Sequence, residues 1–205
     1  MNRFLTIVVT AVAGFVLVAC GPAASGSSSE PSSAASTAAS EAPASSGDVA
    51  GPSFTAGAVA DLEAMIPNTV GSMTLQKTST KGDEFLTSES SDPAVVKFVN
   101  DLGVKPSDIS IAIGFGFSAD ASESLGMFVF RASGADTNRL IAAFKEANDS
   151  DRDTPLVWSN ATVGGKQVEK AVDSDTTYYL YAKDDILFFL SGDPTSTDEV
   201  IGGLP

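Results

Sequence analysis

Three aspartates at alternating positions form the densest group of side chains that could do chemistry. Asp149, Asp151 and Asp153 are spaced like the first three ligands of a calcium-binding loop. The rest of the loop departs from that pattern, because Thr154 stands where the sharp turn needs glycine and Arg152 would repel a cation. We therefore expect either a weak Ca²⁺ site on these aspartates or a solvated polar loop.

Aromatic side chains near the C-terminus are candidates for ligand contact. Trp158, Tyr179 and Tyr181 could line a surface for a carbohydrate or an apolar ligand. Tyr179 and Tyr181 are two residues apart, so they share one face of the expected strand, with Tyr178 on the other face. The alternative is ordinary strand packing, with the tyrosine hydroxyl groups reaching the surface.

The composition removes several classes of function. The chain has no histidine, which excludes Ser-His-Asp and Cys-His catalysis and most histidine-based metal sites. Its net charge of −14 argues against binding of nucleic acid, which needs clustered lysine and arginine. We expect no cofactor and no enzymatic activity; a hydrolase that uses carboxylates alone is the alternative.

The single cysteine ends an N-terminal apolar run. Arg3 precedes the run 4–18, which is too short and too often interrupted for a confident membrane span. The residues LVAC that end at Cys20 resemble the lipobox of bacterial lipoproteins. The resemblance implies a signal peptide over 1–19, cleavage before Cys20 and a diacylglycerol on its sulfur. Two or three acyl chains, palmitate among them, would anchor the protein stably in the cell membrane, on its extracytoplasmic face.

A linker separates this cysteine from the folded domain. Residues 20–53 are almost wholly serine, alanine, glycine and proline, a composition that cannot build a core. A flexible coil of this length has a root-mean-square reach of roughly 30 Å. We expect one folded domain over 54–205, held away from the bilayer by this tether.

Alternating residues predict several strands in that domain. Over 108–118, DISIAIGFGFS, large apolar residues alternate with small ones, so one face should look into a core. Gly114 and Gly116 should let another segment approach the small face closely. The other expected strands and turns are a strand at 125–132, a turn at 164–165 and a hairpin formed by 178–182 and 186–190.

Capping residues predict three helices. The first begins at Pro93 after an aspartate and ends at Gly103, and the second follows Gly134. The third should start with a capping box at 196–199, and a weaker helical turn is expected at 59–65.

This order of elements predicts the α+β class, with an antiparallel sheet and helices packed mainly on one face. The segment 69–77, TVGSMTLQK, matches four of nine residues of 162–170, TVGGKQVEK. This echo raises the hypothesis of two pseudo-repeated ββα-type halves, with a ligand cleft between them.

The segments DLEAMIP, TVGGKQV and GGLP resemble domains of uncharacterised secreted bacterial lipoproteins, a resemblance that implies no activity. We expect a membrane-tethered extracytoplasmic protein that binds a small ligand or an envelope protein. The alternatives are the carboxylate-based hydrolase and a structural envelope lipoprotein.

Overall fold

A computed structural model of the chain describes residues 53–89, 93–150, 152–173 and 176–205. The expected signal peptide, Cys20 and almost the whole linker lie outside these residues. In the part that is described, no helix is both long enough and apolar enough to cross a membrane.

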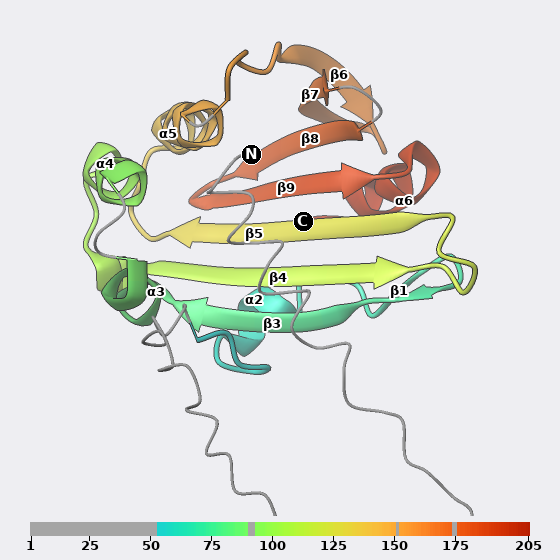
Figure 1. Cartoon of the computed structure of the whole chain (residues 1–205), viewed down its shortest axis with the longest axis horizontal. Helices are drawn as coiled ribbons and strands as arrows, with labels where there is room; N and C mark the ends of the chain where they lie inside the picture. Colours follow the sequence, from blue (N-terminus) through green and yellow to red (C-terminus); the bar gives the residue numbers. More distant parts are fainter. Residues whose placement is uncertain (1–52, 90–92, 151, 174–175) are drawn as a thin grey trace, which may run out of the picture.

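The centre of the fold is a seven-stranded sheet in which every neighbouring pair of strands is antiparallel (Figure 1). In spatial order its strands are β3 (Gln76–Lys81), β4 (Ile109–Phe117), β5 (Ser124–Ala132), β9 (Ile186–Gly192), β8 (Thr176–Lys183), β7 (Lys166–Asp173) and β6 (Ser159–Val163). A separate two-stranded sheet joins β1 (Thr69–Val70) to β2 (Met73–Thr74). The α+β class and the antiparallel sheet are thus confirmed.

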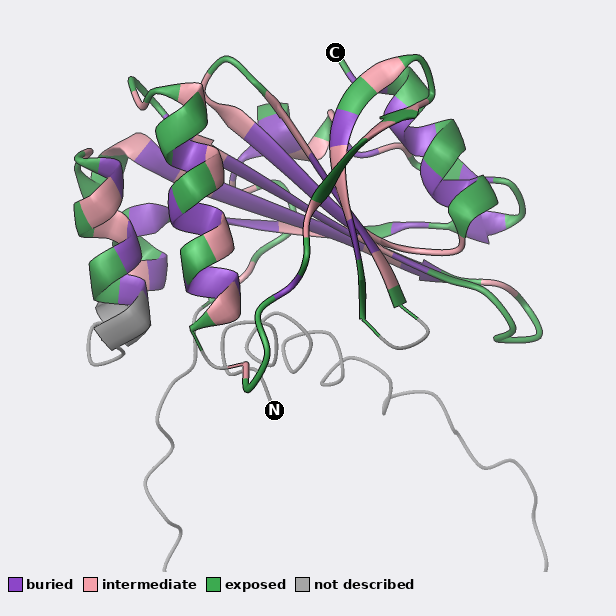
Figure 2. Cartoon of the chain, turned by 90° about the horizontal axis from the view of Figure 1, so that it is seen from above, coloured by how far each residue is buried: buried purple, intermediate pink, exposed green. Residues whose placement is uncertain are grey.

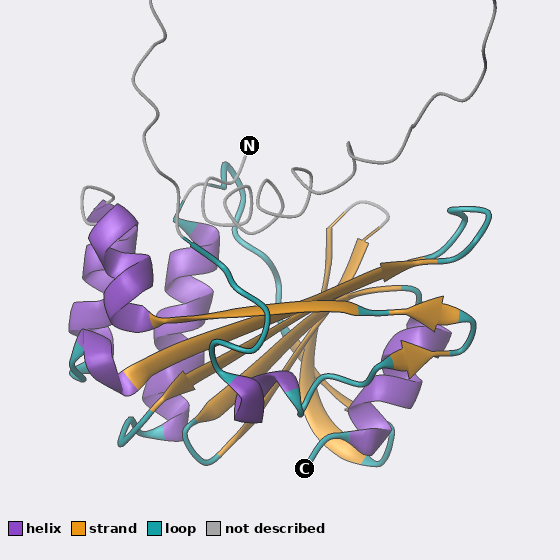
Figure 3. Cartoon of the chain, turned by 90° about the horizontal axis from the view of Figure 1, so that it is seen from below, coloured by secondary structure: helices purple, strands orange, loops and turns teal. Residues whose placement is uncertain are grey.

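Three helices cover part of one face of the large sheet. They are α3 (Gly82–Glu89), α4 (Pro93–Leu102) and α5 (Thr137–Asp149). Their apolar side chains form one core cluster with β4, β5, β8 and β9; Phe98 of α4, for example, packs edge-on against Phe130 of β5. We call this side of the sheet the α5 face. All three helices gather at one end of the strands (Figure 3).

The opposite side, which we call the α6 face, has its own core, and buried residues run along the strands between the two cores (Figure 2). Two helices contribute to it, α2 (Ala60–Glu63) and α6 (Pro194–Gly203), together with the β1–β2 hairpin. In the described part of the chain, helices therefore lie on both faces of the sheet, three on one and two on the other, where the sequence predicted mainly one face. Both clusters consist of residues between Phe54 and Leu204, so the described part of the chain contains its own cores.

β4 shows why the second core could form. The isoleucines of its large face lie in the core with α3–α5, so the prediction that this face looks into a core is confirmed for them. Ala112 on its small face is also completely buried. A Cβ at Gly114 would lie 2.6 Å from Cγ2 of Ile66, and one at Gly116 would lie 3.0 Å from the carbonyl oxygen of Thr74. The predicted close approach is confirmed, and the approaching segment belongs to the chain itself.

Two helices begin where a capping aspartate satisfies free backbone N–H groups. Asp136 accepts hydrogen bonds from the first turn of α5, and Asp193 does the same for α6. The predicted start of the last helix at 196–199 was too late, because Pro194 takes the first helical position directly after Asp193. Helix α3 was not predicted, since Phe85 and Leu86 are its only large apolar residues and they are adjacent in sequence.

Both segments of the sequence echo form tight hairpins. Gly71 turns β1 into β2 with φ of 53°, and Gly164 turns β6 into β7 with φ of 55°. The first hairpin forms a separate two-stranded sheet, while the second forms the β6 edge of the large sheet. A Cβ at Gly164 would lie 2.4 Å from the backbone nitrogen of Gly202, so this turn is fitted against α6.

Candidate ligand-binding pocket

Of the three aspartates predicted as calcium ligands, Asp149 has a structural role in the loop that follows α5. Asp149 accepts a hydrogen bond from the backbone N–H of Leu156 at 3.2 Å, which closes the loop after α5. Asp153 is exposed and Asp151 lies outside the described residues. Within the described ranges, no three histidine, cysteine, aspartate or glutamate side chains are grouped so that they could hold a metal ion.

The three aromatic residues predicted as ligand contacts do not come together. Trp158 packs against the core of the α5 face, with Lys145 over its ring at 5.5 Å from the centroid. Tyr179 and Tyr181 share the α6 face, as their spacing predicted. Tyr179 is fully buried there, and Tyr181 donates a hydrogen bond to the carbonyl oxygen of Pro205 at 2.9 Å.

A different group of aromatic residues is accessible, because the helices leave one end of the α5 face open. In Figure 1 the helices α4 and α5 are seen end-on while the strands run across the picture, so each helix crosses the strands. A helix is about 10 Å wide, whereas a strand of nine residues is about 30 Å long. Ile113 of β4 is covered, Phe115 is half-buried and Phe117 is 58% exposed. Along β4, this face is therefore buried near the helices and exposed at the far end of the strand.

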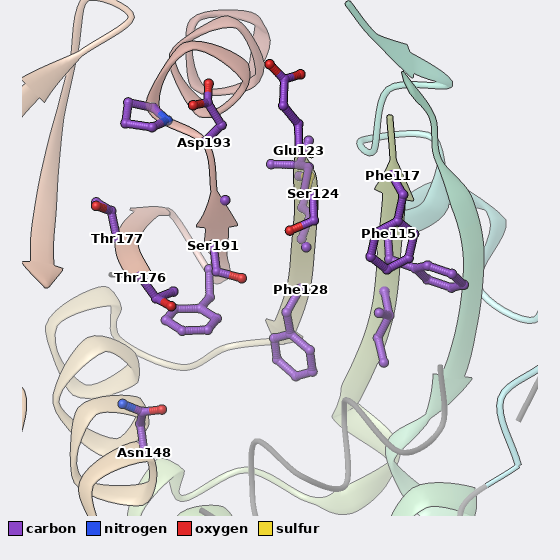
Figure 4. A pocket seen from close by; sticks show the side chains of 18 of the residues that line it. Phe115, Phe117, Glu123, Ser124, Phe128, Asn148, Thr176, Thr177, Ser191 and Asp193 are labelled. Carbon is purple, nitrogen blue, oxygen red and sulfur yellow. The ribbon is translucent and has the colours of Figure 1, made fainter. Parts of the chain in front are cut away.

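At this open end the sheet forms a pocket of about 650 Å³ that is open to solvent on one side. Such a volume lies in the range of sites for small ligands, roughly 300–1,000 Å³. Residues of β4, β5, β8, β9 and α5 line it (Figure 4). The labelled lining residues are Phe115, Phe117, Glu123, Ser124, Phe128, Asn148, Thr176, Thr177, Ser191 and Asp193.

Strand register explains the depth of the pocket. Phe115 of β4 is paired with Gly126 of β5, and Gly126 is paired with Ser191 of β9. The middle strand thus carries no side chain between a phenylalanine and a serine. One row further toward the helices, Phe128 and Phe189 are paired across β5 and β9 and close the floor.

The rim of the pocket is polar and carries acidic groups. Hydroxyl groups come from Ser124, Thr176 and Ser191, and carboxylates come from Glu123 and Asp193. Among the described residues that line the pocket there is no lysine or arginine. A ligand here would meet aromatic surface below, hydroxyl groups at the sides and negative charge at one end.

The turn between β4 and β5, at the mouth of the pocket, is held by a network of hydrogen bonds. Ser118 and Ser122 donate their hydroxyl groups to Oδ1 of Asp120, at 2.7 and 2.8 Å. These bonds, that of Ser118 first, lower the pKa of Asp120 from 3.8 to about 2. The charged carboxylate therefore keeps the turn ordered next to the lining residues Ser122 and Glu123.

This pocket was not predicted from the sequence, although part of its signal is present in the strands. On the face of β5 that looks into the pocket, the residues change from Phe130 and Phe128 to Gly126 and Ser124. On β9 the same face ends at Ser191. A change from large apolar to small polar residues at adjacent strand ends indicates an uncovered hollow, but only once the pairing of β5 with β9 is known.

Comparisons with known proteins add nothing to this site: no family model, curated protein or solved structure matches the chain. The fold and the chemistry of the pocket are therefore the basis for its function.

Proposed function

We propose that this chain is a lipid-anchored extracytoplasmic protein that binds a small ligand, without catalysis, in the pocket at the open end of the α5 face. The observation that carries the proposal is the exposed Phe117 beside a concave, aromatic floor. Exposed apolar surface that is gathered in a hollow costs solubility and is a common feature of binding sites. Acylation of Cys20 and the linker would hold this site near the membrane surface.

The position of the pocket in the sheet supports this proposal. It spans the junction of β5 with β9, where the strands of the N-terminal part of the domain meet those of the C-terminal part. A cleft at that junction is where two pseudo-repeated halves would place a ligand. The division of the domain into two pseudo-repeated halves is part of this proposal, and the similar hairpin turns at Gly71 and Gly164 support it.

The hydrolase alternative would need a pair of carboxylates free to act on a ligand. Among the described residues of the lining, the acids are Glu123 and Asp193. Oδ1 of Asp193 accepts hydrogen bonds from the backbone N–H groups of Thr195 and Ser196, at 2.9 and 3.4 Å. A carboxylate that caps a helix in this way favours a structural role for Asp193, and binding is the function that the pocket supports best.

The test is to identify what the pocket holds when the protein is made in a bacterium. Residues 21–205 contain both cores, so they can be exported behind an ordinary cleavable leader and purified without detergent. Native mass spectrometry should show a bound small molecule that organic solvent releases. The variant Phe117→Ser should lose it, while Val157→Ser, at an exposed apolar residue outside the pocket, should keep it.

A wild-type protein that carries no molecule, and shows no stabilisation in a thermal-shift screen of small ligands, would contradict the proposal. That result would favour the structural alternative or an envelope protein as partner.

A further inference from the structure

The two ends of the pocket differ in chemistry. Glu123 and Asp193 lie together at one end, beside the start of α6, whereas Phe128 lies toward the other end, where α5 presents Asn148 (Figure 4). Phe144 of α5 continues the apolar end, with its ring centroid 6.1 Å from that of Phe128. A ligand that fills the pocket would therefore have an apolar body at the phenylalanine end and a polar or charged head group at the end with the two carboxylates.

The negative charge at the end of the pocket with Glu123 and Asp193 determines which ligand head group can bind there. Glu123 is exposed, and the negative charge of Asp193 is partly offset by the N–H groups that it caps. Glu123 is thus the main charged partner for a ligand group at this end. An anionic head would meet carboxylates without an opposing lysine or arginine among the lining residues, in a chain of net charge −14. A cationic head would find charge of the opposite sign.

The aromatic side of the pocket also favours a cation. Phe115 and Phe117 project from β4 on the right side of Figure 4, at the same level as Ser124. The face of a phenyl ring carries negative potential, so it attracts an ammonium group and most strongly a quaternary one. Because Phe117 is 58% exposed, its ring is accessible from the solvent side.

We propose that the pocket binds a cationic amphiphile, a molecule with an apolar chain or ring and an ammonium head. The head lies between Glu123 and the ring of Phe117, and the apolar body lies over Gly126 toward Phe128. This inference rests on the proposed function, because it assigns the ligand class of the same pocket. It predicts discrimination by head-group charge among ligands that share one tail.

The experiment uses three probes with the same ten-carbon tail. Decyltrimethylammonium, decyl maltoside and decyl sulfate are titrated into residues 21–205 by isothermal calorimetry, each below its micellar concentration. Circular dichroism at the end of each titration checks that the fold persists. We expect the cation to bind about tenfold more tightly than the neutral probe, and the anion to bind most weakly. The preference should fall as salt is added.

Two pairs of variants test which residues cause the preference for the cationic head group. Glu123→Gln should reduce the preference for the cation several-fold and leave the neutral probe unchanged, while Glu199→Gln, at an exposed acid of α6 outside the pocket, should change neither. Phe117→Ser should weaken all three probes, and Val157→Ser none.

The outcomes separate the inference from the function on which it rests. Equal binding of the three probes, or tighter binding of the maltoside, would overturn the cationic head while leaving a small-ligand pocket in place. Binding of none of the probes would overturn both the ligand class and the apolar pocket as a binding site.

Discussion

Gly126 of β5 lies directly opposite Ser191 of β9, and a Cβ at Gly126 would come within 3.1 Å of the serine hydroxyl oxygen. The pocket is deep at this point because Gly126 has no side chain, whereas its partners on the neighbouring strands, Phe115 and Ser191, do. The backbone of Gly126 needs no positive φ, so the closeness of the Ser191 hydroxyl group, rather than the backbone conformation, favours glycine here.

A large side chain at Gly126 should weaken ligand binding without unfolding the protein. Gly126→Leu places a branched side chain over the floor, and we expect ligand affinity to fall at least tenfold, on the order of 1.4 kcal/mol or more. Gly126→Ala adds one methyl group next to a serine side chain that can rotate, so it should retain most of the affinity. Calorimetry with the best ligand compares the two variants.

Thermal unfolding is the control for this pair. Both variants should unfold close to the wild-type midpoint, since strand interiors accept side chains better than glycine. A Gly126→Leu protein that folds and binds as tightly as the wild type would contradict the assignment of the pocket floor.

Asp193 joins the stability of α6 to the acidic end of the pocket, and two substitutions separate these roles. Asp193→Ala removes the cap of α6 and should lower the free energy of unfolding by about 1 kcal/mol. Asp193→Asn keeps an oxygen that accepts hydrogen bonds from the helix N–H groups, so it should cost little stability while removing the charge.

Urea denaturation measures the loss of stability for each Asp193 variant. If the two substitutions destabilise the protein equally, the charge of Asp193 rather than its capping bonds stabilises the helix.

Much of the fold follows from local patterns in the sequence. The alternation along β4 and the apolar stripes of α4 and α5 place these elements correctly, because one residue in two or in three to four must face a core. The second core was not predicted from the small face of β4. Small residues there are consistent with solvent, and only the return of Ile66 against Gly114 shows that the face is buried.

The pocket was not predictable for a related reason. Ile113, Phe115 and Phe117 occupy the same face of one strand, and nothing in their spacing tells that helices cover only the first of them. Coverage depends on where α5 crosses the sheet, which is a tertiary property. Tyr179 shows the converse, since a tyrosine expected near a ligand lies fully buried under the elements of the α6 face.

The carboxyl group of Asp120, in the turn at the mouth of the pocket, should titrate at an unusually low pH. The pKa of Asp120 is lowered to about 2, so its carboxylate bonds contribute fully above its ordinary value of 3.8 and are lost as the pH falls through about 2. Carboxyl ¹³C shifts followed by NMR should give this low midpoint. Ser118→Ala should raise it toward 3.8, because that hydroxyl is the largest cause of the shift.

Ser124→Ala is the matched control for the titration, since Ser124 lies on the pocket wall beyond the Asp120 network. A midpoint in the wild-type protein near 3.8 would show that the hydroxyl bonds do not persist in solution.

Membrane attachment should depend on a single sulfur atom. Cys20 is the only cysteine in the chain, so Cys20→Ser removes every site for thioether-linked lipid. In a bacterium fed an alkyne analogue of palmitate, the wild-type protein should take up the label and partition into the detergent phase of Triton X-114. The variant should remain unlabelled and keep its leader, because the resemblance to a lipobox implies that cleavage follows lipidation. Unchanged labelling of the serine variant would place the acyl chains elsewhere and remove the basis for the tethered arrangement. Loss of label with correct export of the folded domain would instead assign the anchor to Cys20 alone.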